Sequence, residues 1–294
     1  MVRQNMPAAE VEIDSALVRH LLESQRPDLA EAEIAPLSFG WDNVSFRIGA
    51  SRVARLPRRE MAAGLIENEA TWLPELAPRL PLPVPAMEFL GEASGRYPWR
   101  WLITPFISGE PAGTVPDLDV TGCATQIGGF LAALHRPAPA NAPHNPFRGG
   151  PLNDRDETTR QRFAALHRPA DRARLSSLWD ESLTAEPFDG APVWLHGDLH
   201  PQNLLVTDGT LSGVIDFGDI TSGDPATDLV VAWSLVGKEH ELFWDAYGST
   251  AAALRLRARG WAISLGLAYV ANSADNPAME SIGEETLQAV LDLS

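Results

Sequence analysis

The spacing of apolar residues predicts one helix followed by an antiparallel sheet at the start of the chain. A helix is expected over residues 15–25, because three leucines fall on one face and Asp14 or Ser15 can cap the first turn. Three short apolar runs typical of strands follow, and residues 49–51, Gly-Ala-Ser, suit a tight hairpin between the last two. The runs cover residues 33–39, 44–48 and 52–56.

A longer helix and two more strands complete this first region. Helical spacing resumes over residues 59–77, where Pro74 is expected to kink or fray the last turns. Glu69 shares a helical face with Trp72 and Leu73, which we expect to pack on the sheet. Beyond a proline-rich stretch, further strands are predicted at residues 86–91 and 99–107.

Residues 108–113 combine glycine, proline and small side chains, a composition that marks a linker. We therefore expect an N-terminal lobe over residues 1–107 and a C-terminal lobe over residues 108–294. In the second lobe, helices are predicted at residues 118–135, 158–166 and 171–183 and again from Pro225 onward, with a polar segment at residues 137–153. Short strands, the last two joined by a turn at Asp208-Gly209, interrupt them at residues 193–195, 203–206 and 211–215.

These elements predict an α+β protein with a small antiparallel-sheet lobe and a larger, mostly helical lobe. The length of 294 residues suits two lobes. Hydrophobic residues make up 45% of the chain, which is enough for a packed core and excludes global disorder.

The net charge of −16, from 23 basic and 39 acidic residues, changes the expected partners. A negative field repels phosphate backbones and anionic lipids, so nucleic acid and membrane partners are not expected. The same field would attract a cationic ligand, although it can equally serve solubility alone.

The single cysteine, Cys123, excludes an intramolecular disulfide and is expected to pack inside a helix. The first 17 residues lack an apolar leader, and the longest apolar stretch, residues 261–271, falls short of a membrane span. We expect a soluble cytoplasmic protein, and the sequence does not indicate its oligomeric state.

Two short polar segments carry the sharpest chemical signal. Residues 196–203 read His-Gly-Asp-Leu-His-Pro-Gln-Asn, and residues 215–219 read Ile-Asp-Phe-Gly-Asp. An aspartate five residues before an asparagine, followed beyond a strand pair by Asp-Phe-Gly, is the order found at phosphoryl-transfer sites. The carboxylate of Asp198 can accept a proton from an attacking hydroxyl, and oxygens of Asn203 and Asp216 are ligands that Mg²⁺ prefers.

These residues resemble the catalytic loop and metal motif of the aminoglycoside phosphotransferase family, which shares the protein-kinase-like fold and includes macrolide-phosphotransferase-like members. That family has His-Gly-Asp in place of the His-Arg-Asp of protein kinases. The resemblance runs from residues 38–43 to the helices beyond Asp228. It implies that Asp198 helps transfer the γ-phosphate of ATP or GTP, with Mg²⁺, to a hydroxyl of a small acceptor.

The resemblance also implies a nucleotide site in the first lobe. The loop of residues 39–45, with Gly40 and Asn43, would cover the phosphates. The backbone of residues 104–107, including Phe106 and Ile107, would hold the base.

One position departs from the kinase pattern, which places a lysine on the third strand. The only lysine of this chain is Lys238, so Arg55 must supply the charge. Glu69 is its expected partner on the following helix, with Glu67 second; a solvated edge-strand arginine is the alternative.

Several other residues have plain structural readings. His196 and His200 are four apart, but the intervening Gly197 and the following proline argue against a zinc-binding helix, and His196 is expected to brace the loop. Asp219 could approach the metal or stabilise its own loop, and Asp228 is read as structural support. Asp224 is expected to cap a helix beginning at Pro225. Four tryptophans are read as core or substrate-wall residues: Trp194, Trp233, Trp244 and Trp261.

The resemblance suggests an aminoglycoside as the acceptor, and an acidic cleft would suit that polycation. A macrolide, a nucleoside antibiotic, a sugar or an amino alcohol stays open, because one fold serves many acceptors. Two readings from other classes are an inactive nucleotide-binding pseudokinase, motivated by the missing lysine, and a metal-dependent hydrolase. The acceptor is expected to contact residues 153–189 and the C-terminal helices.

Overall fold

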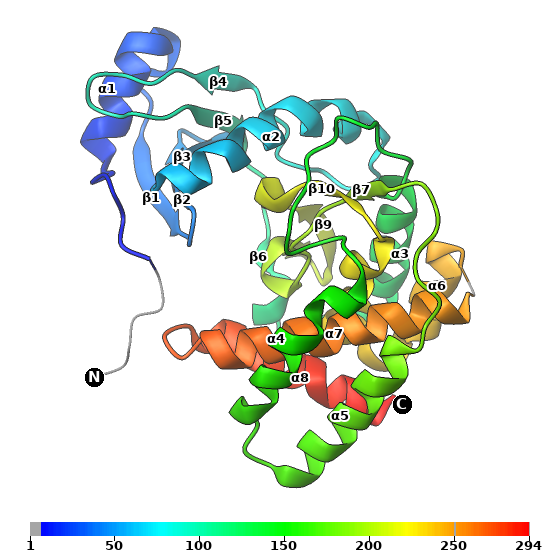
Figure 1. Cartoon of the computed structure of the whole chain (residues 1–294). Helices are drawn as coiled ribbons and strands as arrows, with labels where there is room; N and C mark the ends of the chain where they lie inside the picture. Colours follow the sequence, from blue (N-terminus) through cyan, green and yellow to red (C-terminus); the bar gives the residue numbers. More distant parts are fainter. Residues whose placement is uncertain (1–6, 250, 294) are drawn as a thin grey trace.

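The computed structural model describes residues 7–249 and 251–293, and in it a twisted sheet stands above a bundle of helices (Figure 1). The expectation that the first 17 residues lack an apolar leader falls partly outside this range, because residues 1–6 are not described. Five antiparallel strands form the sheet in the order β1-β2-β3-β5-β4. Their bounds are β1 Ile34–Phe39, β2 Asn43–Ile48, β3 Arg52–Pro57, β4 Phe89–Gly91 and β5 Trp101–Pro105.

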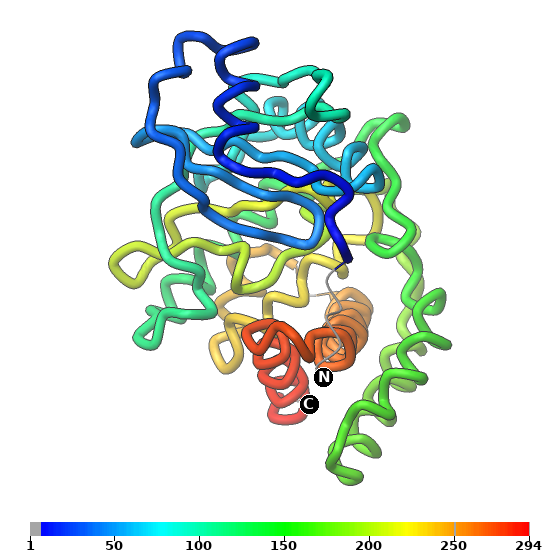
Figure 2. The backbone as a smooth tube through the Cα atoms, turned by 90° about the vertical axis from the view of Figure 1, so that its left-hand side faces the viewer, coloured from blue at the N-terminus to red at the C-terminus, as the bar shows by residue number. Residues whose placement is uncertain are grey.

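Successive side chains of a strand point to opposite faces of the sheet, and one helix covers each face. On one face, Trp101 and Ile103 of β5 pack under α1 (Ser15–Gln25), which crosses that face in Figure 2. On the other, Leu102 packs against α2 (Glu60–Leu76). Arg55 of β3 alternates with buried neighbours that face α1, so its side chain lies on the α2 side.

Helix α2 joins the sheet to the helical lobe. Ile66 and Ala70 make the sheet contact, whereas Trp72 and Leu73, expected on the sheet, pack with the core of the second lobe instead. Trp72 lies 5.0 Å from Trp194, centroid to centroid. The expectation failed because α2 lies between two hydrophobic surfaces, and helical spacing does not say which surface a turn meets.

The second lobe is mostly helical, with two small sheets set into its upper surface. Its helices are α3 Val120–Leu134, α4 Asp156–Arg162, α5 Pro169–Leu183, α6 His240–Tyr247, α7 Ala252–Asn272 and α8 Pro277–Asp292. One sheet has the order β6-β8-β9 and the other pairs β7 with β10. Their strands are β6 Glu110–Pro111, β7 Val193–Leu195, β8 Leu204–Thr207, β9 Thr210–Val214 and β10 Thr221–Gly223. Among the described helices, none is both long and apolar enough to cross a bilayer.

Four details differ from the sequence-based expectation. Residues 110–111 of the expected linker form β6, and β10 was not predicted. From Pro225 the chain first makes a 3₁₀ helix (Pro225–Val230) and a π-helical turn (Ala232–Val236), and α-helix resumes only at His240. Every residue of the 3₁₀ helix is buried, so no polar face indicated its period. Helix α2 also runs through Pro74 to Leu76.

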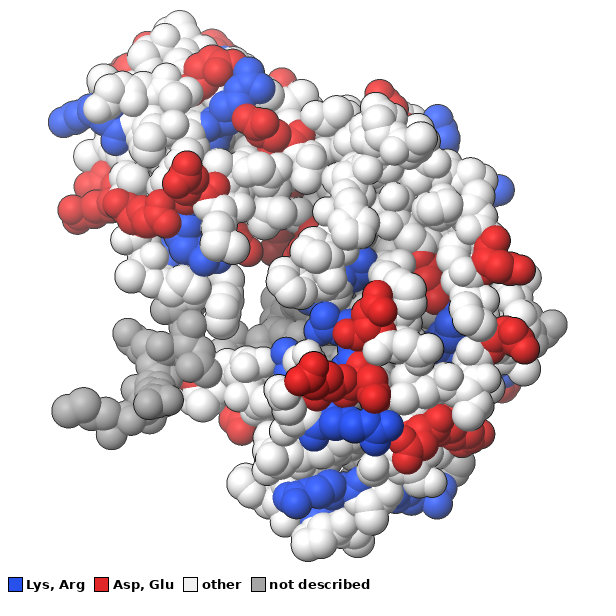
Figure 3. Space-filling view, in the orientation of Figure 1, with Lys and Arg blue, Asp and Glu red and all other residues white. Residues whose placement is uncertain are grey.

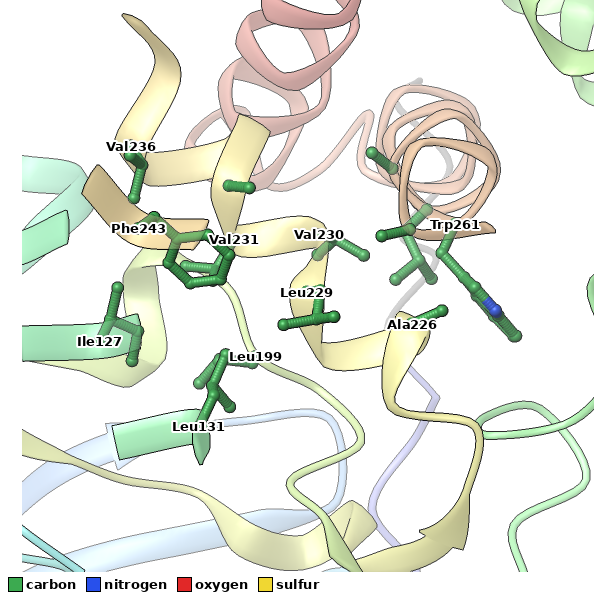
Figure 4. Packing of buried hydrophobic residues seen from close by; sticks show 14 of the residues in the cluster. Ile127, Leu131, Leu199, Ala226, Leu229, Val230, Val231, Val236, Phe243 and Trp261 are labelled. Carbon is green, nitrogen blue, oxygen red and sulfur yellow. The ribbon is translucent and has the colours of Figure 1, made fainter. Parts of the chain in front are cut away.

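The core of the second lobe lies where α3, α6, α7 and the 3₁₀ segment converge (Figure 4). The four tryptophans support the core reading: Trp194, Trp244 and Trp261 are buried, and Trp233 is partly buried against the same core. Cys123 is also fully buried in α3, as expected. Leu199, from the loop after β7, reaches this core beside Leu131, so the packing of the bundle bears directly on that loop.

Two adjacent glycines of α3 provide a matched test of this packing. A Cβ at Gly128 would lie 2.6 Å from the backbone oxygen of Phe243 in α6, whereas a Cβ at Gly129 meets nothing within 4 Å. We predict that Gly128→Ala lowers the free energy of unfolding by about 1–3 kcal/mol through overpacking. Gly129→Ala should raise it by up to ~1 kcal/mol through helix propensity. Urea denaturation of the two variants measures both; equal effects would contradict the close α3–α6 contact.

Candidate active site

The loop of residues 196–203, here called the catalytic loop, leaves β7 through a backbone conformation that requires glycine. Gly197 has φ +87°, and a Cβ there would lie 2.3 Å from the backbone oxygen of Asp219. The two polar segments that the sequence singled out therefore meet backbone to backbone. Leu199 then enters the core, so Asp198 stands on a loop fixed on both sides.

The carboxylate of Asp228 fixes the start of this loop. The backbone N–H groups of His196 and Gly197 donate to its two oxygens at 2.7 and 2.9 Å. His135 Nε2 donates to the same carboxylate at 3.2 Å, and the Tyr247 hydroxyl lies 2.9 Å from His135 Nδ1. Complete burial favours the neutral acid, but the His135 hydrogen bond and charge, with the loop amides, hold the pKa of Asp228 below its usual range. The expected supporting role of Asp228 is confirmed.

His196 braces the loop rather than binding a metal. Its Nε2 donates to the Ile215 carbonyl at 3.0 Å, and its Nδ1 accepts from the Asp198 amide at 3.2 Å. Both ring nitrogens are therefore occupied, which is incompatible with a zinc ligand. The ring also lies 4.5 Å from that of Phe217, so it ties the catalytic loop to the second motif.

Asp198 is surrounded by donors. Arg148 Nη2 donates to its Oδ1 at 3.1 Å, and His200 Nε2 lies 3.4 Å from its Oδ2. Burial opposes its charge, but the charge and hydrogen bond of His200, and then those of Arg148, outweigh burial and hold the pKa of Asp198 far below its usual range. The carboxylate is therefore ionised at neutral pH and can accept a hydrogen bond from a hydroxyl.

Asn203 and Asp216 supply two further oxygens near this aspartate. Asn203 is buried, and its Nδ2 donates to the Asp198 carbonyl at 2.9 Å. With the nitrogen used in this way, the amide oxygen is the atom left to bind a cation. Asp216 has φ +63°, a left-handed conformation uncommon outside glycine, and its side chain is half exposed. The second motif, residues 215–219, thus exposes the Asp216 carboxylate instead of burying it.

A chain of ionic contacts links this motif to the sheet. Arg55 of β3 pairs with Glu69 of α2, and its Nη2 donates to Asp216 Oδ1 at 2.8 Å. Glu69 is the partner that helical spacing favoured, and the solvated alternative for Arg55 is wrong, because both side chains are buried. Burial raises the pKa of Glu69, an effect that Arg55 opposes and Asp216 reinforces.

The residues expected to bind nucleotide in the loop after β1 and in the segment after β5 mostly form hydrogen bonds and contacts with their own surroundings. The Gly40 amide donates to the Asn43 carbonyl at 2.9 Å, and Asn43 Oδ1 is buried without a partner among the described residues. Phe106 donates its N–H to the Ser51 carbonyl at 2.8 Å, so a base would have to use another group of that segment. Ile107 packs against Gly213. The role of these four residues toward nucleotide stays a prediction.

Sequence reasoning missed the residues that reach the two motifs from other parts of the chain. Arg148 also donates through Nε to the Gly197 carbonyl at 2.6 Å, and Asn145 donates to Asp219 at 2.6 Å. The Tyr269 hydroxyl of α7 is buried near Asp198 without completing a hydrogen bond to a described residue, and burial, then the Asp198 charge, raises its pKa. The Asn-Pro-Phe-Arg-Gly-Gly stretch that brings Arg148 and Asn145 reads as an ordinary loop, so no pattern indicated its place.

Asp224, expected as a helix cap, does accept from the Ala226 amide at 3.0 Å, and it also forms a buried ion pair with Arg257 at 2.7 Å. Pro225 follows it at the start of the 3₁₀ helix, as predicted. Asp219 contacts Asn145 and lies close enough to Asp198 for burial and that charge to raise its pKa. The loop-stabilising reading of Asp219 is therefore the better supported one.

Comparison with known proteins identifies the family of this chain. Residues 33–261, most of the chain, match the phosphotransferase enzyme family. The chain belongs to this family. The aminoglycoside 3'-phosphotransferase of Escherichia coli is 28% identical over 145 residues, or 47% of this chain. The match spans about half (53%) of that relative.

Solved structures share the protein-kinase-like fold over nearly the full chain. The GDP and kanamycin complex of APH(2'')-IIIa has a TM-score of 0.70 at 20% identity and covers 95% of this chain and all (100%) of that one. Macrolide 2'-phosphotransferase MphH from Brachybacterium faecium, as the apoenzyme, has a TM-score of 0.62 at 22% identity, with coverage of 93% and 98%. The expected two-lobed α+β class is confirmed.

The Asp228 contacts predict a pH-dependent contribution to stability. Because folding lowers the pKa of Asp228, its carboxylate stabilises the fold above the ordinary value of 3.8, and this contribution is lost as the pH falls through the folded-state value. Asp228→Asn should cost about 3 kcal/mol at neutral pH. The difference from wild type should stay constant above about pH 5 and shrink at lower pH, as the pH falls through 3.8 toward the lower folded-state pKa. Denaturation curves across this range measure it; a pH-independent difference would contradict the charged role.

The buried Arg55 pair predicts a separable effect on stability. Arg55→Met leaves the Glu69 carboxylate buried without its partner and should cost about 3–5 kcal/mol of unfolding free energy. The double variant Arg55→Met/Glu69→Gln removes both charges and should recover most of that loss. Thermal denaturation of the two proteins tests this, and equal stability of the single and double variants would show that Glu69 does not depend on Arg55.

Proposed function

We propose that this protein transfers the γ-phosphate of ATP or GTP to a hydroxyl of a small molecule. The observation that carries the proposal is the junction of the two motifs, where the ionised Asp198 and the oxygens of Asn203 and Asp216 lie on turns tied together by Gly197 and His196. Membership of the phosphotransferase enzyme family supports it.

In this proposal Asp198 orients the acceptor hydroxyl and receives its proton. The hydroxyl oxygen forms a new bond to the γ-phosphorus, the bond from that phosphorus to the β-bridging oxygen breaks, and a nucleoside diphosphate leaves. A carboxylate suits this task because it adds no positive charge beside the nucleophile and is ionised at working pH.

Magnesium fits the donors present. Within residues 7–249 and 251–293 no cluster of three His, Cys, Asp or Glu side chains could enclose a metal, a finding that gives no support to the hydrolase reading. Asn203 and Asp216 offer two hard oxygens, and such a pair suits an ion that keeps waters and phosphate oxygens as its other ligands. When bound, the ion would neutralise charge on the transferring phosphates.

Arg55 would take the place of the kinase lysine at the phosphates. A guanidinium is always charged and can bind phosphate oxygens in pairs, and Glu69 holds it in position from α2. Its contact with Asp216, a proposed metal ligand, supports this role. Solved family structures with GDP, and one with ATP and streptomycin, make both purine donors reasonable here.

The acceptor is proposed as a hydroxyl-bearing small molecule. Kanamycin, gentamicin and streptomycin are named in complexes of aminoglycoside phosphotransferases that share the fold. An aminoglycoside is therefore the first acceptor to test, with macrolides, sugars and amino alcohols beside it.

Replacing the proposed base provides the decisive experiment. Asp198→Ala should lower transfer by about 10²–10⁴-fold, because proton acceptance and hydroxyl orientation are lost, while nucleotide binding persists. The protein is incubated with Mg²⁺, ATP or GTP and the acceptor panel, and mass spectrometry detects an added phosphoryl group. Asp208→Ala, in the hairpin turn between β8 and β9, is the matched control and should keep wild-type activity. Wild-type protein that binds nucleotide yet neither hydrolyses nor transfers phosphate would indicate a pseudokinase.

A further inference from the structure

Three arginines extend from the catalytic loop along α4, on the side of the site where the sequence placed the acceptor. Arg148 contacts Asp198 directly, Arg155 precedes α4, and Arg162 ends it. Arg155 and Arg162 are seven residues apart, about two helical turns, so they lie close to one face. Figure 3 shows basic side chains over α4, at and below the hollow between the lobes, with acidic groups among them.

Their partners distinguish these arginines from the others of the same region. Arg160, on the same helix, is neutralised by Asp156 at 2.8 Å and Asp180 at 2.7 Å. Arg155 and Arg162 form no ion pair with any residue that the structure describes. Arg155 Nε and Arg162 Nη1 are buried and lack hydrogen-bond partners there. A buried donor without an acceptor is costly, and an anionic ligand would supply the acceptor.

The electrostatic surroundings point the same way. Burial first, and then the charge of Arg148, lowers the pKa of Arg155; burial, Arg155 and Arg148 lower that of Arg162. The nearby acidic groups Asp198 and Asp219 raise the pKa of Arg148 instead, and among the described residues only Asp154 opposes the lowering of the Arg155 pKa. The two outer arginines therefore experience more positive than negative charge.

Helix α7 forms the wall behind them. The Arg155 guanidinium lies 6.0 Å from the ring of Trp261, and farther along the same helix Tyr269 brings its buried hydroxyl near Asp198. One helix thus backs both the arginines and the proposed base. An acceptor whose hydroxyl lies at Asp198 would extend past the Tyr269 hydroxyl toward Arg155.

We propose that the acceptor of this phosphotransferase carries a carboxylate or phosphate group, and that Arg155 and Arg162 bind this group while the acceptor hydroxyl lies at Asp198. The inference rests on the proposed function and narrows its substrate class. It runs against a polycation, because an ammonium group at this position would be repelled by both guanidinium groups. The net charge of −16 does not bear on this local pair.

The first test measures anion binding without needing the true acceptor. With the nucleotide site filled by Mg²⁺ and a non-hydrolysable ATP or GTP analogue, malonate and sulfate are titrated while the melting temperature is followed. Wild type and Arg160→Met should be stabilised at low millimolar anion, and Arg162→Met should need at least about tenfold more. Methionine keeps the apolar stem, and losing one of several like charges should not impair folding. Equal responses of all three proteins, or none in wild type, would overturn the inference.

The second test compares acceptors that differ only in the anionic group. Glycerate is paired with glycerol, serine with serinol and glucose 6-phosphate with glucose, and kanamycin represents polycations. In each pair in which transfer occurs, kcat/KM should be at least about tenfold higher for the anionic member. Arg155→Met and Arg162→Met should raise KM for the anionic acceptors more than they lower kcat. Preference for kanamycin or for the uncharged members would overturn the inference. Hydrolysis of ATP or GTP in the same preparations tests the proposed function separately. If the protein hydrolyses nucleotide but does not discriminate among the acceptors, only the anion site is refuted. If it neither hydrolyses nucleotide nor phosphorylates any acceptor, the proposed function itself is refuted.

Discussion

The buried carboxylate of Asp228 is the constraint on which the site depends. It is fully buried, so its charge is tolerated only because two loop amides and His135 are directed at it. Those contacts position the turn that carries Asp198, and His135 connects them to α3 and to Tyr247 of α6. The position of the proposed base Asp198 therefore depends on the close packing of α3 on α6. The irregular 3₁₀ and π-helical stretch from Pro225 to Val236 is the backbone that delivers this carboxylate under the loop.

The second constraint is ionic and crosses between the lobes. Glu69, Arg55 and Asp216 form a chain from α2 through β3 to the second motif. An isolated buried ion pair adds little net stability, but losing one member leaves an uncompensated charge, so the chain acts mainly to specify an arrangement. Because α2 also packs Trp72 and Leu73 into the second lobe, the helix is held by apolar contacts at one end and by Arg55 near its middle. A nucleotide phosphate would compete with Asp216 for the Arg55 guanidinium, whereas a metal ion would compete with Arg55 for the Asp216 carboxylate, so either ligand would change this ionic contact.

The sequence predicted those parts of the site that are local in the chain. Asp198, Asn203 and Asp216 could be proposed because the loop chemistry fixes their spacing. Glu69 was predicted from the helical face that it shares with Trp72 and Leu73. Its pairing with Arg55 is confirmed, although Trp72 and Leu73 pack with the second lobe instead of the sheet. Arg148, Asn145 and Tyr269 could not be proposed, since they reach the two motifs from segments 49 or more positions away whose composition is that of any polar loop or buried helix. The fold class followed from periodicity, whereas β6 and β10, each two or three residues long, carry too little pattern to be recognised.

Net charge was the least informative guide to the acceptor. A total of −16 describes a surface of 39 acidic groups, most of them exposed to water and separated by more than the Debye length of about 8 Å from any one site. What an acceptor experiences is set by the few groups within that distance, where burial weakens screening. At α4 those groups include two arginines that have no carboxylate partner among the residues the structure describes, beside a third that Asp198 already engages. An acidic protein can therefore present a basic wall beside its proposed base, so the total charge does not give the sign of the electric field there.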